Sequence, residues 1–400
     1  MTALASAPAC TESKSGSGEV TATGPVRPPS RPTGEQQATA AALLTGPDWY
    51  RHAVFYEVNV RSVQDSNGDG IGDLNGLISR LDYLKDLGVD ALWLMPIMPS
   101  PFADSGYDVA DYRAIEPAYG TMADFERLLA ESKKRGMRVL IVLVLTHTSS
   151  AHPWFQESRK DKTNPKANWY VWSDTNGRAD IGCGTNGSTF GDSAWELEPA
   201  RQQYYFHRFY PDQPDLNYRE PEVAKEMLDT ARFWLEKGVD GFRCDVVGLL
   251  FETASSCSLV PETVEYIKSI RKLVDEFPDR AMVAEPVELT NATPYFGAGK
   301  DMFHMAFDFA YGYFWGISFA TGDKKTIENA MNTVSAFPDG AQAALVIGSH
   351  DVLRAWQSAG TDPARYRGAA LLQMTMRGTP FIYYGEEVAL RPGTATLIDV

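Results

Sequence analysis

The stretch Gly241-Phe242-Arg243-Cys244-Asp245 determines how the rest of the chain is interpreted. It follows a helical pattern that ends at Lys237-Gly238 and leads into the apolar run 246–250, which is typical of a buried strand. Side chains two residues apart share one face of a strand, so we expect Arg243 and Asp245 to lie side by side. A neighbouring arginine favours the ionised carboxylate, as a nucleophile requires. Considered alone, the stretch fits a buried structural ion pair equally well.

Length and composition restrict the class of protein. The chain has 400 residues, of which 44% are apolar and 22% are charged, and these values are typical of a globular protein with a large core. The formal net charge of -15 argues against nucleic acid or an anionic membrane surface as the main partner. No apolar run reaches about 18 residues, so no membrane-spanning segment is expected.

The four cysteines, Cys10, Cys183, Cys244 and Cys257, have neither the spacing of a metal site nor that of a disulfide framework. Cys244 should point away from Arg243 and Asp245, and we expect it to be a buried apolar residue.

The first 46 residues are rich in Ser, Thr, Gly, Pro and Ala, and we expect a disordered arm. The remainder, 47–400, is expected to form one catalytic domain with a long irregular insertion at about 148–218. Ala7-Pro8-Ala9-Cys10 faintly resembles the lipid-attachment end of a bacterial signal, although the apolar stretch that such a signal needs is missing. This favours, weakly, an envelope or secreted location over the cytoplasm.

From Trp49 onward, apolar strand patterns alternate with helical patterns, which is the sign of parallel βα units. Helices are expected at 74–87, 121–135 and 222–236. The alternation predicts a (β/α)₈ barrel, whose active site lies at the carboxyl ends of the strands. The eight expected strands cover residues 53–60, 90–95, 139–145, 241–245, 282–285, 302–309, 343–347 and 380–384.

Three acids, Asp245, Glu285 and Asp351, end three of these strands. Hydrolysis of a glycosidic bond needs a proton donor for the leaving oxygen and a carboxylate against the oxocarbenium-like centre. Asp245, beside Arg243, suits the nucleophile. Glu285 has no cation near it in sequence, so a raised pKa and the acid/base role suit it. Asp351, next to His350, would bind sugar hydroxyls.

Ordered motifs along about residues 49–387 resemble the α-amylase family of glycoside hydrolases and transglycosylases, within it the α-glucosidase, oligo-1,6-glucosidase and trehalose synthase branch. The matching stretches are Tyr56-Glu57-Val58, Gly106-Tyr107-Asp108, Thr146-His147-Thr148-Ser149, Gln213-Pro214-Asp215-Leu216-Asn217, Gly241-Phe242-Arg243-Cys244-Asp245, Ala284-Glu285, His350-Asp351 and Gly378-Thr379-Pro380-Phe381-Ile382-Tyr383-Tyr384-Gly385-Glu386-Glu387.

The resemblance implies a retaining mechanism on α-linked glucosides. Asp245 would be the nucleophile, Glu285 the acid/base and Asp351 the transition-state stabiliser. The residues implied to hold the sugar are Tyr107, Asp108, His147, Arg243 and His350.

The loop Asp65-Ser66-Asn67-Gly68-Asp69-Gly70-Ile71-Gly72-Asp73 has oxygen-bearing residues at positions one, three, five and nine and a glycine at six, which resembles a calcium loop. Gly76 occupies position twelve, where an EF-hand has Glu, so the loop looks like the single calcium loop of the family's oligosaccharide branch. One Ca²⁺ is expected, and its ligands would be Asp65, Asn67, Asp69, the Ile71 carbonyl and Asp73.

The chain also departs from the family pattern. Val142 and Thr146 occupy positions where an aspartate and an asparagine are usual, and Ser349 replaces the asparagine before His350-Asp351. The asparagine at 146 would serve the family's other calcium site, which we therefore do not expect. The chain stops at Val400, so we expect neither the final barrel helix nor the C-terminal β-sandwich domain.

Three functions fit these observations. The first is an α-glucoside hydrolase, favoured by the three acids. The second is a transglycosylating isomerase such as a trehalose synthase, which uses the same site but excludes water. The third is a non-catalytic binding or scaffold subunit, favoured by the altered residues at 142 and 146. No nucleotide or redox cofactor is expected.

Overall fold

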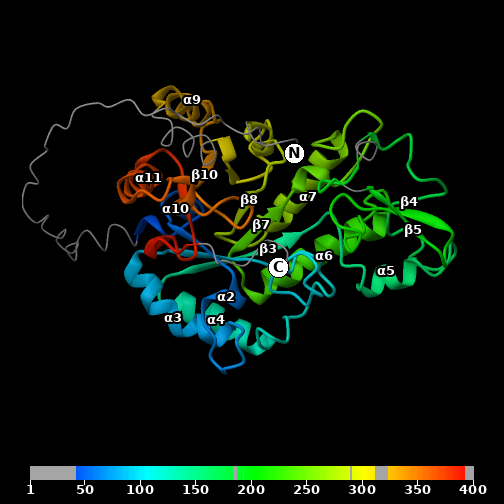
Figure 1. Ribbon diagram of the computed structural model, residues 1–400, viewed down its shortest axis with the longest axis horizontal. Coiled ribbons are helices and arrows are strands. Elements are labelled where there is room, and N and C mark those ends of the chain that lie inside the picture. The colour runs from blue at the N-terminus through cyan, green and yellow to red at the C-terminus, as the bar shows by residue number, and fades with distance from the viewer. Residues whose placement is uncertain (1–41, 183–186, 192, 289–290, 311–322, 392–400) are drawn as a thin grey trace, which may run out of the picture.

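The computed structural model describes residues 42–182, 187–191, 193–288, 291–310 and 323–391 (Figure 1). Strand β7 (Gly241–Asp245) lies in a closed barrel of eight parallel strands, in the order β1-β11-β10-β9-β8-β7-β3-β2. All eight strands predicted from the sequence are present, so the (β/α)₈ prediction is confirmed. The other strands are β1 (Phe55–Val58), β2 (Ala91–Leu94), β3 (Arg138–Val144), β8 (Ala281–Ala284), β9 (Met305–Phe307), β10 (Gln342–Val346) and β11 (Thr379–Tyr383).

Helices connect these strands and lie outside the barrel (Figure 1). The three predicted helices occur as α3 (Leu74–Leu87), α4 (Met122–Lys134) and α6 (Pro221–Lys237). Side chains start two of them, because Asp73 accepts from the Gly76 amide and Thr121 forms a capping box with Asp124. Within the described residues, the structure also has the helices α2 (Val60–Val63), α5 (Pro153–Ser158), α7 (Pro261–Val274), α9 (Lys324–Ser335), α10 (Ala355–Ser358) and α11 (Pro363–Thr375), and short 3₁₀ turns at Trp49–Arg51, Val247–Leu249, Thr293–Phe296 and Glu386–Val388.

The barrel closes where its first strand meets its last. Phe55 pairs with Phe381 in the β1–β11 register, and the two rings stack 4.3 Å apart. Trp93 and Phe307 pack against the same aromatic group from β2 and β9. These rings fill the barrel interior and hold the strand ends at fixed positions.

The insertion predicted as irregular contains a small antiparallel sheet of β4 (Trp172–Ser173), β6 (Gln203–Phe206) and β5 (Trp195–Glu198). Two isolated bridges join the end of the segment to earlier residues: His147↔Asp215 to the residue just before the segment, and Tyr170↔Leu216 to a residue within it. The end of β3 is therefore tied directly to the insertion.

The cysteine expectations have mixed outcomes. Cys244 is fully buried and free, as predicted. Cys257 is disulfide-bonded, a bond that the cysteine spacing did not reveal. Most of the expected disordered arm, residues 1–41, also lies outside them. Among the helices that the structure describes, none is both long enough and apolar enough to cross a membrane.

Candidate active site

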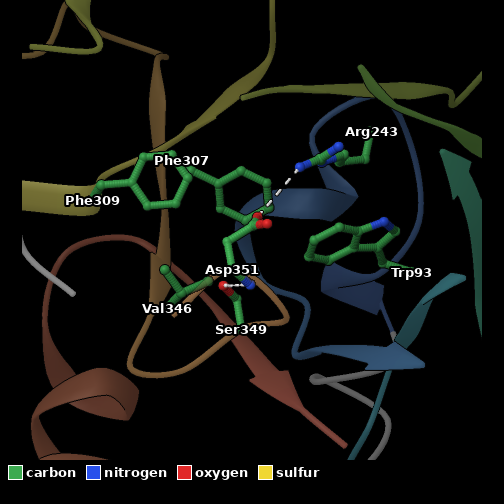
Figure 2. Close-up of a pocket in the computed structure, with 7 residues that line it drawn as sticks. All are labelled: Trp93, Arg243, Phe307, Phe309, Val346, Ser349 and Asp351. Atoms are coloured by element: carbon green, nitrogen blue, oxygen red, sulfur yellow. Dashed lines mark hydrogen bonds and ion pairs between the residues drawn. The ribbon is translucent and has the colours of Figure 1, made fainter. Parts of the chain in front are cut away.

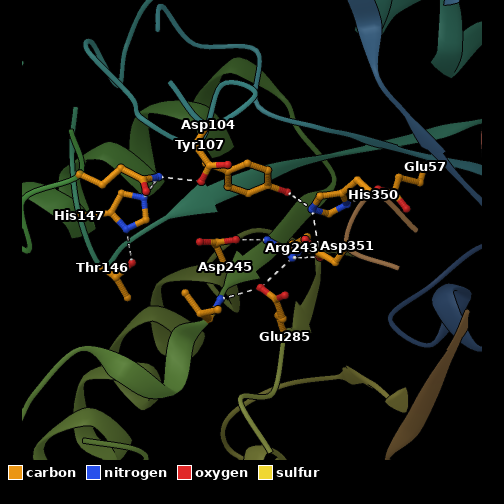
Figure 3. Close-up of polar contacts among 12 residues, drawn as sticks. Glu57, Asp104, Tyr107, Thr146, His147, Arg243, Asp245, Glu285, His350 and Asp351 are labelled. Atoms are coloured by element: carbon orange, nitrogen blue, oxygen red, sulfur yellow. Dashed lines mark hydrogen bonds and ion pairs between the residues drawn. The ribbon is translucent and has the colours of Figure 1, made fainter. Parts of the chain in front are cut away.

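Arg243 lies at the centre of the three predicted acids (Figure 3). Its side chain is only 1% exposed and forms ion pairs with Asp245 and, at 2.7 Å, with Glu285. One guanidinium nitrogen also lies 4.0 Å from the carboxylate of Asp351. Strand alternation thus places Arg243 and Asp245 on one face as expected, and the barrel adds Glu285 from the end of β8 and Asp351 from the loop after β10.

Glu285 is a buried acid next to a cation. Burial raises the pKa of Glu285 to about 8, and the negative charges of Asp245 and Asp351 act in the same direction. Arg243 and the Val246 amide, which donates at 2.9 Å, lower this pKa but do not outweigh burial. No cation is near Glu285 in sequence, but the fold brings Arg243 to it, and the expected raised pKa is present all the same.

His350 connects Asp351 to the first strand. Its Nδ1 lies 2.5 Å from Glu57 Oε1, and its Nε2 lies 3.2 Å from Asp351 Oδ2. Burial lowers the pKa of His350, but the two carboxylates outweigh it and raise the pKa to about 9. Glu57 was missed as a site residue by the sequence analysis, although a buried carboxylate inside an apolar strand is itself a signal.

The loop after β2 supplies the next predicted residues. The Tyr107 hydroxyl lies 2.8 Å from His350 Nε2, so Tyr107 joins the site. Asp108 is fully buried, and its carboxylate accepts hydrogen bonds from the Ser100 hydroxyl and from the amides of Ala103 and Asp104. These bonds show that Asp108 fixes the fold of the loop.

Asp104 was not predicted, yet the structure brings it to the site above Asp245 (Figure 3). Its carboxylate accepts a 2.8 Å hydrogen bond from the side-chain amide of Gln213. Burial raises the pKa of Asp104 to about 6, and the Gln213 hydrogen bond opposes this shift. Gln213 also lies 3.1 Å from Nε2 of His147, which places His147 at the same edge of the site.

A small cavity of about 10 Å³ lies beside Arg243, which is room for about one water molecule (Figure 2). Trp93 forms one wall, with Arg243 5.3 Å from its ring centroid. Ser349 forms another wall, at the position where the family pattern has an asparagine. The cavity is lined by Trp93, Arg243, Phe307, Phe309, Val346, Ser349 and Asp351.

Exposed aromatic residues flank the site on the insertion. Phe209 packs against His147 with ring centroids 5.4 Å apart. Phe190 stacks on Tyr210 at 4.4 Å, and these two side chains are 54% and 36% exposed. Exposed ring faces of this kind suit stacking against another ring.

The predicted calcium loop is closed by its own hydrogen bonds. The carboxylate of Asp65 accepts from the amides of Asn67, Gly68 and Gly70, and Asp69 accepts from the amide of Ile71. Asp73 caps α3 and binds Ser66. The oxygen donors are of the kind that Ca²⁺ prefers. Across the described ranges, however, no three acidic, His or Cys side chains gather closely enough to hold a metal ion.

Comparison with known proteins agrees with this geometry. The sequence profile "Alpha amylase, catalytic domain" matches residues 57–394. The chain therefore belongs to the α-amylase family.

Individual relatives differ in what their names describe. The chain is 39% identical to the trehalose synthase/amylase TreS of Mycobacterium tuberculosis, over 90% of this chain and 66% of that protein. It is also 39% identical to a probable α-glucosidase of Rhizobium meliloti, over 88% of this chain and 70% of that protein. Among solved structures, the α-glucosyl transfer enzyme XgtA superposes with a TM-score of 0.79 at 37% identity, covering 89% of this chain and 71% of that one.

Proposed function

We propose that the protein cleaves α-glucosidic bonds with retention of configuration, as a hydrolase. The observation that carries this proposal is the group of three acids around Arg243, in which Glu285 is held protonated near neutral pH while Asp245 is paired with a cation. An acid that keeps its proton beside a paired carboxylate is the division of roles that a retaining glycosidase needs.

In the first step, Asp245 attacks the anomeric carbon while Glu285 transfers its proton to the departing glycosidic oxygen. A covalent glucosyl–Asp245 ester and a free alcohol result. In the second step, ionised Glu285 removes a proton from water, which attacks the anomeric carbon and releases Asp245 and glucose. Asp351 and His350 would hold sugar hydroxyls through both steps, together with Tyr107 and Asp104.

A second candidate uses the same ester but transfers the glucosyl group to a sugar hydroxyl. Two observations favour it: the names of the relatives TreS and XgtA, and the exposed Phe190–Tyr210 pair, whose ring faces could hold an acceptor sugar. A sugar bound there would keep water from the ester and would return the glucosyl group to a different oxygen.

One experiment separates these functions. The purified chain is incubated with maltose, isomaltose, trehalose and p-nitrophenyl α-glucoside in the presence of calcium, and the products are analysed by NMR. Free glucose that is lost in the Asp245→Asn variant supports the hydrolase, and the preferred substrate gives the linkage.

Trehalose formed from maltose with little glucose would support the transferase. A folded chain that acts on none of the four substrates would overturn both catalytic proposals and would favour the non-catalytic binding subunit.

A further inference from the structure

Thr146 and His147 form a buried pair where β3 enters the insertion. Both residues are at most 3% exposed, and the Thr146 hydroxyl lies 2.8 Å from Nδ1 of the His147 ring. Threonine stands here where the resemblance leads one to expect asparagine. A hydroxyl can either donate to Nδ1 or accept from it, so this contact alone does not determine where the ring proton lies.

The orientation of Gln213 resolves this ambiguity. Its amide oxygen accepts a 3.1 Å hydrogen bond from the Tyr210 backbone amide, which can only donate. The other end of the side chain is therefore the NH₂ group, which donates at 2.8 Å to the Asp104 carboxylate. Both the oxygen and the nitrogen of the Gln213 amide therefore have a suitable partner. Gln213 is fully buried, so water does not compete for these hydrogen bonds.

The NH₂ group of Gln213 also lies 3.1 Å from Nε2 of His147. A donor there requires that Nε2 be an acceptor, so the single proton of the neutral ring lies on Nδ1 and points to the Thr146 hydroxyl. Burial lowers the pKa of His147 and favours the neutral ring, against the opposing charges of Asp245 and Asp108 and the Tyr107 carbonyl.

We propose that Thr146 is a positioning residue because its hydroxyl accepts the Nδ1 proton of the tautomer that Gln213 requires. His147 in this form accepts from the Gln213 amide, which orients the Asp104 carboxylate at the sugar site. The chain of contacts runs from the buried residues Thr146, His147 and Gln213 to the half-buried Asp104. With the proton on Nε2 instead, two N–H groups would face each other and the Gln213 amide would move. The kinetic part of this proposal depends on the proposed function, whereas the tautomer does not.

The first test is spectroscopic. Thr146→Val removes the hydroxyl with little change in shape, and Thr146→Ser retains it as the matched control. Histidine is labelled with ¹⁵N, and long-range ¹H–¹⁵N correlations assign the two ring nitrogens of His147, with His147→Gln identifying its signals among the six histidines. We expect the Nδ1–H pattern in the unmodified chain and in Thr146→Ser, and its loss in Thr146→Val.

An Nε2–H tautomer in the unmodified chain, or an unchanged tautomer in Thr146→Val, would overturn the proposal. Because this readout needs no substrate, it decides the question even when no glucoside is cleaved.

The second test measures turnover. Thr146→Val should lower kcat/KM for the preferred glucoside by about tenfold, because a misplaced carboxylate weakens sugar binding, and Thr146→Ser should restore most of it. Circular dichroism and thermal unfolding establish that both variants fold. A Thr146→Val variant with altered tautomer but unchanged KM and kcat would overturn the positioning role.

Discussion

Glu285 touches a guanidinium and nevertheless keeps its proton near neutral pH. Both facts follow from its position, because burial disfavours the charged form and two further carboxylates share the same arginine. Ionisation of Glu285 therefore lowers the stability of the folded state. Its protonation state can be measured in two independent ways, by the pH dependence of stability and by the pH dependence of turnover.

The first prediction concerns stability against pH. The pKa of Glu285 is about 8 in the fold and about 4.3 in an unfolded chain, so the folded state binds more protons between these values and its stability falls as pH rises through this window. Glu285→Gln mimics the neutral acid and keeps a carbonyl oxygen for Arg243. We expect it to raise Tm relative to the unmodified chain at pH 8, and to change it little at pH 4.5.

Turnover gives the matching test. The unmodified enzyme should lose activity on the alkaline side as Glu285 ionises, and Glu285→Gln should lack this limb. The variant should retain far more activity on α-glucosyl fluoride, whose leaving group needs little protonation, than on maltose.

In the stability measurement, a Tm difference between Glu285→Gln and the unmodified chain that is equal at pH 8 and pH 4.5 would contradict the assigned pKa shift.

At the scale of elements, β7 and β8 can pair closely because residue 241 is a glycine and has no side chain. Gly241 has φ +145°, and a Cβ atom there would lie 1.8 Å from the backbone oxygen of Ala281, its partner in the register. Gly241→Ala must therefore displace the strand that carries Arg243 and Asp245. We expect destabilisation of more than about 4 kcal/mol, measured by urea unfolding, together with loss of activity.

Gly136→Ala is the control for backbone strain alone. Gly136 has φ +67° but no atom within 4 Å of the added Cβ, so about 1–2 kcal/mol is expected. An equal loss of unfolding free energy in the two variants would show that the clash with Ala281 does not destabilise the fold.

The loop 65–73 carries the next prediction, since we propose that it binds Ca²⁺. Backbone hydrogen bonds from Gly70 and Gly68 lower the pKa of Asp65, so this acid is ionised at neutral pH. Calcium at about 100 times its Kd should stabilise the fold by about 2.7 kcal/mol, seen as a higher Tm than in EGTA. Asp69→Asn keeps an acceptor for the Ile71 amide but removes a charge, and it should weaken this effect.

Asp111→Asn serves as the control, because Asp111 is an exposed acid that also accepts from a nearby amide, that of Arg113. The Tm of Asp111→Asn should rise with calcium by as much as that of the unmodified chain. The absence of both binding heat in calorimetry and a Tm change would rule out a calcium site in this loop.

Elements whose signals are local were predictable from sequence. Helix α3 has the predicted bounds because Asp73 caps its start, and β3 was found from its apolar run. Contacts between distant positions were not predictable. Glu57 and His350 are 293 residues apart, and their meeting depends on barrel closure, while the Gln213 contacts with His147 and Asp104 depend on how the insertion folds back.

For the whole molecule, barrel closure explains why the site could be predicted in outline. Parallel strands must present their carboxyl ends at one rim, so Asp245, Glu285 and Asp351 converge although up to 106 residues separate them (351 minus 245). The same rule says nothing about loops, so it could not show that Asp104 reaches the site or that the Asp108 carboxylate accepts hydrogen bonds within its own loop.

The last prediction concerns the net charge of -15. An excess of one sign of charge repels itself and destabilises the compact state, and salt screens this repulsion as the Debye length falls from about 30 Å at 0.01 M to about 10 Å at 0.1 M. We therefore expect Tm at pH 8 to rise by a few degrees over this range of NaCl. Near pH 5 the effect should vanish, because the sequence pI is about 4.9.

Two other electrostatic effects must be separated from this one. Ionisation of Glu285 also lowers stability at pH 8, but it is absent in Glu285→Gln, so the salt effect should persist in that variant. Exposed ion pairs such as Lys134–Glu131 respond in the opposite direction, since salt weakens their attraction. Each such pair is worth little, whereas the repulsion is summed over the whole surface. A Tm that falls with added salt at pH 8 would show that the ion pairs dominate and that the net charge does not limit stability.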